Sequence, residues 1–256
     1  MARSPGACVR ARLNGTDIIP AVDVKAIFFD AGETLVYPHP SFAELFSEVL
    51  RSEGHHIDPA VVQETVSAYS HRFTEAAKRG EMWSVSADRS RAFWFGIYRD
   101  FLGEVGIEGD AEKLANVLYG TFSDPGSYRL HPDAIPTLDR LESTGIPLGV
   151  ISNFEEWLER LLDALGVTRY FPVRVISGVE GVEKPDPRIF EIALERAGVP
   201  AAGSVYVGDH PYFDVEAAGD VGMLPILIDR RGRYADADCI RITSLEDLPA
   251  AIGLDA

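Results

Sequence analysis

The chain has 256 residues, of which 46% are hydrophobic and 25% are charged, a balance typical of globular rather than disordered proteins. It carries 40 acidic residues against 24 basic ones, and this net charge of −16 argues against nucleic acid or an anionic membrane surface as a partner. No apolar run approaches the 18 residues of a membrane-spanning helix. The two cysteines lack the spacing of a zinc site and cannot form a disulfide framework, which favours a cytoplasmic protein.

The first 22 residues differ in pattern from the rest of the chain. Arg3, Arg10 and Arg12 are spread through them, and no long apolar run precedes a small-residue cleavage site, as a signal peptide would require. We therefore expect residues 1–22 to form a flexible N-terminal extension.

Short apolar runs predict the strands of a sheet. The first covers residues 24–29, and similar runs recur at 147–152, 173–177, 204–208 and 224–228. Helical periodicity separates them at residues 131–143, 155–165 and 188–197. This alternation predicts an α/β core, residues 23–37 and 129–256, with a Rossmann-like parallel sheet.

Residues 38–128 break the alternation and are helical in pattern throughout. They hold 13 of the 25 aromatic residues of the chain. We interpret the segment as a helical domain inserted after the first strand, with most of these rings forming its core. A second hypothesis, compatible with the first, is that some rings between Trp83 and Phe101 line a substrate pocket.

Four polar clusters lie next to the predicted strands and helices. Residues 30–35 and Ser152–Asn153 each follow a strand, Lys184–Pro187 precedes a helix, and Asp209 follows a strand five residues before Asp214. One aspartate in such a place is usually a cap or turn residue. Together the clusters bring three carboxylates, an ammonium and a hydroxyl to the carboxyl edge of the sheet, where α/β proteins bind ligands. Charges are costly to bury without a partner, so these residues predict a site.

These four motifs, in this order and with a helical insertion between the first and second, resemble the haloacid dehalogenase (HAD) superfamily of hydrolases. The runs Ile151–Phe154, Glu183–Phe190 and Val207–Asp209 carry most of the resemblance. It implies a subfamily IA-like core with a C1-type helical cap. It also implies that Asp30 is the nucleophile and forms an aspartyl-phosphate.

The resemblance further implies a Mg²⁺ site and a phosphoryl site. Asp30, Asp209 and the backbone carbonyl of Gly32 are expected to hold Mg²⁺, with Asp214 acting through water or orienting the lysine behind them. The phosphoryl oxygens are expected to contact Thr34, Ser152 and the backbone amide of Asn153, while Lys184 neutralises their developing charge. This agrees with what the residue types suggest, since a phosphate dianion beside carboxylates needs a metal and a cation.

One position departs from the family pattern. HAD phosphatases usually carry a second aspartate two residues after the nucleophile, which protonates the leaving group and later activates water. Gly32 stands there in this chain. Such acid–base assistance contributes about 10²–10⁴ in rate. The candidates to replace it are Glu33 and His210.

Three hypotheses remain for the activity. The first, which we favour, is a cytoplasmic phosphoric monoester hydrolase, monomeric or homodimeric, acting on a small-molecule phosphate. The second is C–P or C–halogen cleavage, but Asp209 and Asp214 favour Mg²⁺ and argue against dehalogenation, and a phosphonate route requires a cap lysine such as Lys78 or Lys113. The third is a weakly active or non-hydrolytic protein that binds or regulates.

Overall fold

The computed structural model describes residues 11–13, 16–18, 23–107 and 109–254. The expected N-terminal extension therefore lies largely outside the described residues. Within it, β1 (Ala11–Leu13) and β2 (Thr16–Ile18) form a short antiparallel pair that the sequence did not indicate.

A six-stranded parallel sheet forms the core, in the order β10-β9-β8-β3-β6-β7. Its strands are β3 (Ala26–Phe29), β6 (Leu148–Ser152), β7 (Val173–Ile176), β8 (Ser204–Gly208), β9 (Leu224–Ile228) and β10 (Ile240–Ile242). The first five confirm the predicted strands and the α/β class. The sixth is three residues long, too short for its pattern to be read in advance. Because β3 lies between β6 and β8, its carboxyl end is flanked by two further strand ends.

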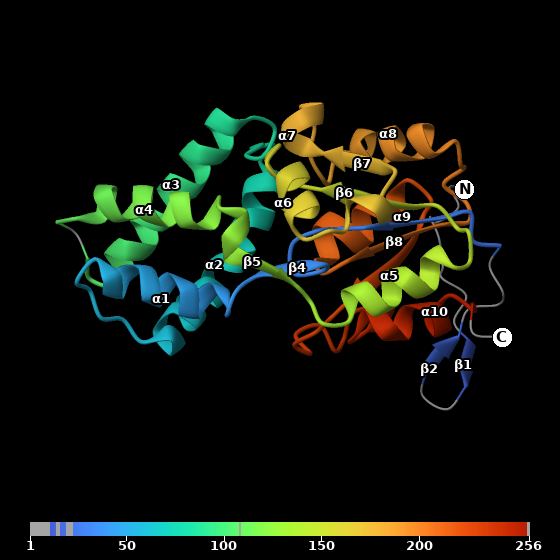
Figure 1. Cartoon of the computed structure of the whole chain (residues 1–256), viewed down its shortest axis with the longest axis horizontal. Coiled ribbons are helices and arrows are strands. Elements are labelled where there is room, and N and C mark those ends of the chain that lie inside the picture. The colour runs from blue at the N-terminus through green and yellow to red at the C-terminus, as the bar shows by residue number, and fades with distance from the viewer. Residues whose placement is uncertain (1–10, 14–15, 19–22, 108, 255–256) are drawn as a thin grey trace, which may run out of the picture.

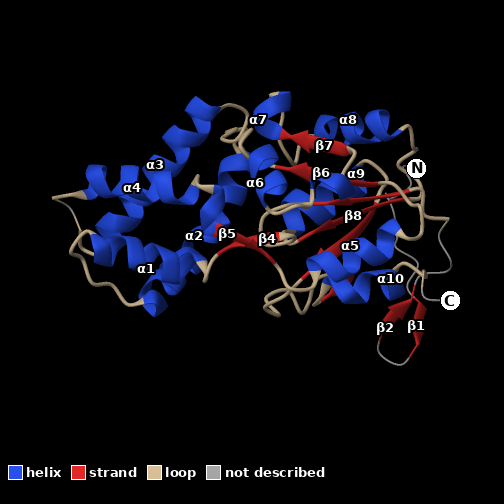
Figure 2. Cartoon of the chain, viewed as in Figure 1, coloured by secondary structure: helices blue, strands red, loops and turns tan. Residues whose placement is uncertain are grey.

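Helices cover both faces of the sheet, as Figures 1 and 2 show on the right of the view. Successive side chains of β3 point to opposite faces. Ile27 and Phe29 pack with residues of α5 (Ala134–Glu142), α6 (Leu158–Ala164) and α10 (Leu248–Ala251). Ala26 and Phe28 pack with residues of α8 (Pro187–Ala197) and α9 (Ala217–Asp220). A short helix, α7 (Ser177–Glu180), follows β7.

The boundaries of α8 illustrate how local chemistry sets a helix. Asp186 caps its first turn by accepting a hydrogen bond from the Arg188 N–H, and Pro187 occupies the first helical position. Gly198 ends the helix in the left-handed conformation, at φ 67°. The helix begins and ends close to the predicted range of residues 188–197, and its start places Lys184 just before the first turn.

Four helices form a separate unit, on the left in Figure 1. They are α1 (Phe42–Ser52), α2 (Pro59–Lys78), α3 (Ala87–Glu104) and α4 (Ala111–Phe122), and we call residues 42–122 the helical insertion. Its own core is rich in aromatic residues, including Phe46, Phe101 and Phe122. The insertion is joined to the core through β4 (Val36–Pro38) and β5 (Tyr128–Leu130), an antiparallel pair that the sequence did not predict. Among the described residues, no helix is both long and apolar enough to cross a membrane.

Candidate active site

Asp30 lies directly after β3, at the carboxyl edge of the sheet. Its backbone N–H donates to the Val207 carbonyl at 2.8 Å, which extends the β3–β8 pairing by one residue. Its Oδ1 accepts hydrogen bonds from Ser152 Oγ at 2.9 Å and from Lys184 Nζ at 2.8 Å. Burial raises the pKa of Asp30, and the nearby Asp214 carboxylate adds to this, while Lys184 opposes it.

Lys184 is 3% exposed and is surrounded by oxygen atoms. Its Nζ donates to Asp30 Oδ1, to Asp214 Oδ1 at 2.6 Å and to the Tyr206 hydroxyl at 2.9 Å. Burial lowers the pKa of Lys184, but the two carboxylates outweigh burial and hold it above its ordinary value. The ammonium is therefore charged at neutral pH.

Asn153 positions the backbone of Lys184. The Asn153 Nδ2 donates to the Lys184 carbonyl at 2.8 Å, and the Lys184 N–H donates to Asn153 Oδ1 at 2.7 Å. Because both main-chain groups of Lys184 are held by one side chain, the loop after β6 and the loop before α8 are fixed relative to each other.

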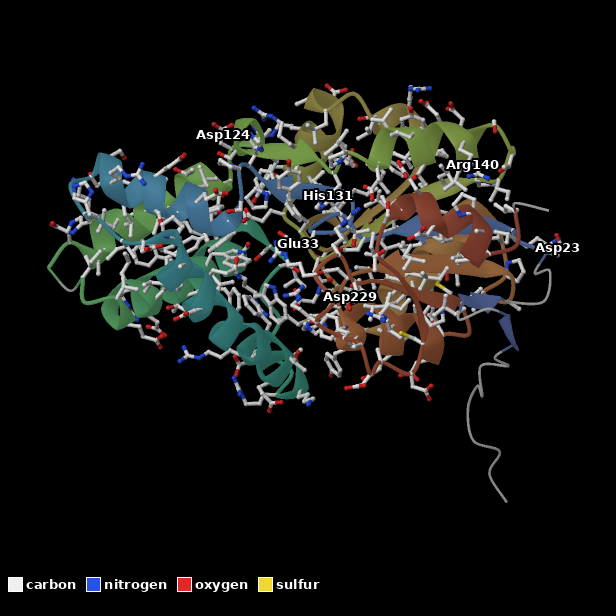
Figure 3. All side chains as sticks on the ribbon, turned by 90° about the horizontal axis from the view of Figure 1, so that it is seen from below. Asp23, Glu33, Asp124, His131, Arg140 and Asp229 are labelled. Atoms are coloured by element: carbon white, nitrogen blue, oxygen red, sulfur yellow. The ribbon has the colours of Figure 1, made fainter. Side chains whose placement is uncertain are left out.

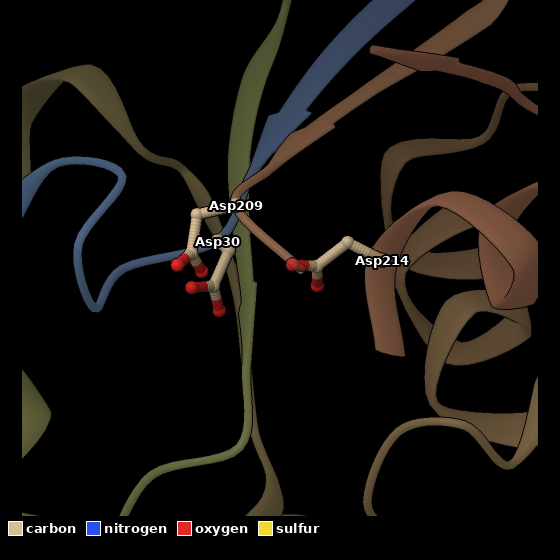
Figure 4. A group of neighbouring side chains, drawn as sticks. All are labelled: Asp30, Asp209 and Asp214. Carbon is tan, nitrogen blue, oxygen red and sulfur yellow. The ribbon is translucent and has the colours of Figure 1, made fainter. Parts of the chain in front are cut away.

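The carboxylates of Asp30, Asp209 and Asp214 lie close together (Figure 4). One oxygen each of Asp30, Asp209 and Asp214 lies within 4.8 Å of the others. Asp214 comes from the helical turn Pro211–Glu216, which passes so close to β8 that a Cβ on Gly208 would overlap the Asp214 carboxyl group. The close approach of Asp214 therefore requires a glycine at position 208.

The three carboxylates differ in their hydrogen-bond and ion-pair partners. Asp214 accepts hydrogen bonds from Lys184 Nζ and from the His210 N–H at 2.8 Å, and its Oδ1 lies 3.2 Å from the Tyr206 hydroxyl. The nearest cation to Asp209 in the described chain is Arg233, with Nη2 3.8 Å from Oδ2. Burial and the neighbouring Asp214 and Asp30 raise the pKa of Asp209 well above its ordinary value. Unrelieved repulsion between hard oxygen donors is the chemistry that a divalent cation offsets, so the donor set fits a metal at Asp30 and Asp209.

His210 follows Asp209 and lines the same cavity. Its Nδ1 accepts from the backbone N–H groups of Tyr212 at 3.1 Å and Phe213 at 3.4 Å, so the neutral ring carries its proton on Nε2. Burial lowers the pKa of His210, which favours this neutral form. In that form His210 offers a donor and no free lone pair.

The loop after Asp30 is held by Arg230, which lies in the loop that follows β9. Arg230 donates to the backbone carbonyls of Glu33 at 3.3 Å and Thr34 at 2.8 Å, and it forms a two-pronged ion pair with Asp133 at 2.6 and 3.0 Å. Glu33 takes the left-handed conformation, at φ 55°, and pairs with Arg231 at 3.0 Å. Figure 3 shows Glu33 and His131 where the helical insertion meets the core.

A cavity of about 380 Å³ connects these groups. Its core wall contains Asp30, Ser152, Asn153, Lys184, Asp209 and Asp214, together with Gly32, Glu33 and His210. Its opposite wall is formed by aromatic side chains of the helical insertion, including Phe42, Phe46, Phe73, Trp83, Trp94 and Phe101. The predicted site residues thus gather at one place, and aromatic residues of the insertion face them.

Thr34 is the exception among the predicted site residues. Its side chain is fully buried, does not line the cavity, and leaves Oγ1 without a hydrogen-bond partner. The two lysines considered for a phosphonate route also lie off the cavity wall. Lys78 pairs with Glu75, and Lys113 pairs with Glu53.

Two core carboxylates, Glu183 and Glu155, join the insertion to the core through contacts that the sequence did not predict. Glu183, which is 4% exposed, accepts from the backbone N–H groups of Trp83 and Ser84 and from Ser84 Oγ. Glu155 accepts from Ser90 Oγ at 2.7 Å and from the Tyr119 hydroxyl at 3.0 Å. These partners are separated by 36 to 100 positions, so no local pattern could have indicated them.

The fold and the site together define a HAD-type hydrolase. The family model for haloacid dehalogenase-like hydrolases matches residues 24–222, and the chain belongs to this family. The resemblance seen in the motifs is thereby confirmed.

Individual proteins of this family resemble the chain over most of its length. Over 238 residues the chain is 32% identical to haloacid dehalogenase-like hydrolase domain-containing protein 3 of Danio rerio, covering 90% of this chain and 97% of that protein. It is 30% identical over 222 residues to the glyceraldehyde 3-phosphate phosphatase of Methanopyrus kandleri, covering 84% and 88%. The crystal structure of the HAD-hydrolase YfnB from Bacillus subtilis, bound to magnesium, matches with a TM-score of 0.71 at 17% identity, covering 90% and 98%, and shows the same fold.

Proposed function

We propose that this chain is a magnesium-dependent phosphatase that hydrolyses a small-molecule phosphate monoester through an aspartyl-phosphate on Asp30. The observation that carries the proposal is the contact of the buried Asp30 carboxylate with Ser152 and Lys184, beside Asp209, on one cavity wall. Family membership and the phosphatase among the relatives support it.

Asp30 attacks phosphorus. Ser152 and Lys184 both hold Oδ1, so we assign the attack to Oδ2. The Oδ2–P bond forms as the bond from phosphorus to the leaving oxygen breaks, and water then releases phosphate from Asp30. A carboxylate needs no separate base to be ionised at pH 7, and the ammonium of Lys184 favours that form.

Lys184, Ser152 and the backbone amide of Asn153 hold the phosphoryl oxygens in this scheme. Lys184 supplies fixed positive charge in a buried site, where it stabilises the transition state more than it would in water. Asp214 acts as a positioning residue, because it holds Lys184 Nζ rather than facing the substrate. Thr34 is left out of phosphoryl binding, since its side chain does not reach the cavity.

Asp30, Asp209 and the carbonyl of Gly32 are the groups that would hold Mg²⁺. When bound, Mg²⁺ offsets the repulsion between the phosphate dianion and the carboxylates and polarises a phosphoryl oxygen. The presence of Asp209 and Asp214 around Asp30 favours this chemistry over metal-free cleavage of a carbon–halogen bond.

Glu33 is our candidate for the missing acid. A Cβ on Gly32 would meet no atom within 4 Å, so the place of the usual aspartate is open space. Glu33 lines the cavity beside it, where it pairs with Arg231 through Oε2, whereas the Nδ1 of His210 accepts from two backbone N–H groups. We assign proton donation to the leaving oxygen, and later activation of water, to Glu33.

We also propose that residues 38–128 act as a cap over the core, residues 23–37 and 129–256. The aromatic wall of the cavity comes from this segment, and closure over the phosphoryl site excludes water.

Phosphate release from a panel of phosphate monoesters, including an aryl phosphate, tests the function. Release is expected to require Mg²⁺ and to vanish in Asp30→Asn, while Asp163→Asn, an exposed aspartate on α6, keeps wild-type rates. Turnover that persists in Asp30→Asn, or that ignores chelation of Mg²⁺, would refute the mechanism.

A further inference from the structure

A second, smaller cavity of about 200 Å³ adjoins the cavity of about 380 Å³ that contains Asp30 and Lys184. The two share wall residues, among them Gly32, Glu33 and Asn153. Its volume is several times the roughly 30 Å³ that one water molecule occupies in the liquid. We call it the side cavity. Gly32 has no side chain, and a Cβ placed on it would meet no atom within 4 Å. No side chain at this position therefore separates the side cavity from the phosphoryl site.

The side cavity is lined mainly by aromatic rings. They come from both parts of the chain: Trp94, Tyr98, Tyr119, Tyr128, Phe154 and Trp157. Several of these rings pack on one another, with centroids 4.7 Å apart for Phe154 and Trp157 and 5.9 Å apart for Trp94 and Tyr98. Ring faces carry negative electrostatic potential, so such a wall attracts a cation.

The charges on the wall have one sign. Glu33 and Glu155 are the carboxyl side chains among the described residues that line the side cavity, and no lysine, arginine or histidine is among them. Glu33 pairs with Arg231 at 3.0 Å, so Glu155 supplies the negative charge of this wall. The two donors that reach Glu155, the Ser90 and Tyr119 hydroxyls, are neutral and leave its negative charge in place. Arg91 packs over the Tyr119 ring at 5.6 Å but is exposed, binds Asn116, and does not line the cavity.

The charge of Glu155 acts on the tyrosines of this wall. Burial raises the pKa of Tyr98, Tyr119 and Tyr128, and the negative charge of Glu155 adds to the rise at all three. Glu155 and the three tyrosines also line the same cavity.

We propose that the side cavity binds a cationic group, a primary or alkylated ammonium, carried by the leaving group of the substrate. This rests on the proposed function, because it places the phosphoryl group at Asp30. Glu155 supplies the counter-charge and the rings supply cation–π contacts, a combination that distinguishes a cation from a neutral group of the same shape. The bond from phosphorus to the amino alcohol breaks as the bond to Asp30 forms, and the alcohol leaves with a proton from Glu33.

A matched pair of substrates tests the charge alone. Phosphocholine and 3,3-dimethylbutyl phosphate have the same shape, but a trimethylammonium group in the first is a tert-butyl group in the second. We expect kcat/KM for phosphocholine to exceed that for the neutral ester by about tenfold or more, from cation–π and carboxylate contacts together. Phosphoethanolamine shows in the same assay whether a primary ammonium is preferred.

Three variants separate charge from packing. Glu155→Gln should bring the ratio of the two kcat/KM values towards one, while Glu156→Gln, an exposed neighbour, should leave it unchanged. Ser90→Ala removes one donor to Glu155 but keeps its charge, so it should keep the preference. A wild-type ratio near one, or a ratio that Glu155→Gln does not alter, would overturn the inference.

Failure of the proposed function gives a different result. If the aryl phosphate is hydrolysed with Mg²⁺ but the two esters are not distinguished, only the cation site is wrong. If no phosphate is released from any compound, the proposed phosphatase function is wrong. Calorimetric titration of the protein then tests whether the side cavity binds a cation. Choline that binds wild type but not Glu155→Gln, while 3,3-dimethylbutanol binds neither, would support the site, and absence of choline binding would overturn it.

Discussion

Replacing Tyr206 by phenylalanine removes one buried hydroxyl from beneath the active site and keeps the ring. Tyr206 is fully buried on β8, and its hydroxyl lies 2.9 Å from Lys184 Nζ and from the Ile151 carbonyl. The hydroxyl has one proton. Since the contact to Asp214 is longer, at 3.2 Å, we assign that proton to the Ile151 carbonyl and the lone pair to Lys184.

The magnitude depends on which partners are left unmet. Tyr206→Phe leaves the buried Ile151 carbonyl without this donor, which costs about 1–3 kcal/mol in the free energy of unfolding. Lys184 keeps its two carboxylates, so we expect kcat to fall by less than about tenfold, or about 1.4 kcal/mol in the barrier. Lys184→Met instead leaves Asp30 and Asp214 buried without their cation. That change should cost about 3–5 kcal/mol in stability and abolish turnover.

Urea unfolding followed by circular dichroism, and kcat on an aryl phosphate, measure the two effects. Tyr37→Phe is the matched control, because the hydrogen bond that its hydroxyl makes among the described residues is a long one, 3.4 Å to His39 Nδ1. We expect a change within about 0.5 kcal/mol in this variant. A loss below about 0.5 kcal/mol for Tyr206→Phe, or one as large as that of Lys184→Met, would refute the assigned network.

Four further outcomes are expected. Mg²⁺ should raise the melting temperature of the wild type but not of Asp209→Asn, and an equal rise in both would remove Asp209 from the metal site. Gly32→Asp, which has open space for its side chain, should raise kcat/KM on alkyl phosphates, by at most about 10²–10⁴, and an unchanged rate would mean that Glu33 already supplies the acid fully. Glu183→Ala should lower the free energy of unfolding by about 2–4 kcal/mol because it leaves the Trp83 and Ser84 N–H groups buried and unpaired, whereas exposed Glu156→Ala should not. Burial lowers the pKa of His131 to about 4, so the folded state disfavours its protonation, and stability should fall as pH drops from about 6.5 towards 4. Between pH 7 and 5 the free energy of unfolding should fall by about 1 kcal/mol more in wild type than in His131→Gln, a figure that allows for the partial exposure of the ring. If the free energies of unfolding of the two proteins depend on pH in the same way, this prediction is wrong.

The sequence by itself determined the α/β class and the place of the candidate site. Apolar runs such as residues 204–208 are long enough to signal buried parallel strands, and Gly198 and Pro187 mark helix ends through local backbone preference. Because parallel strands share one carboxyl edge, polar residues after β3, β6 and β8 had to converge there. From that rule the sequence alone predicts that Asp30, Ser152 and Asp209 lie together.

Only the tertiary structure decided which partners surround those residues. Tyr206 has the pattern of an ordinary core residue of β8, and its role appears only once Lys184 is seen to reach its hydroxyl. The pairs Arg230–Asp133 and Glu183–Ser84 each join residues about 100 positions apart. Local propensity and periodicity act over a few residues. The direction of a side chain across a domain interface depends on how whole elements pack, and the charge of the side cavity was therefore set by the fold.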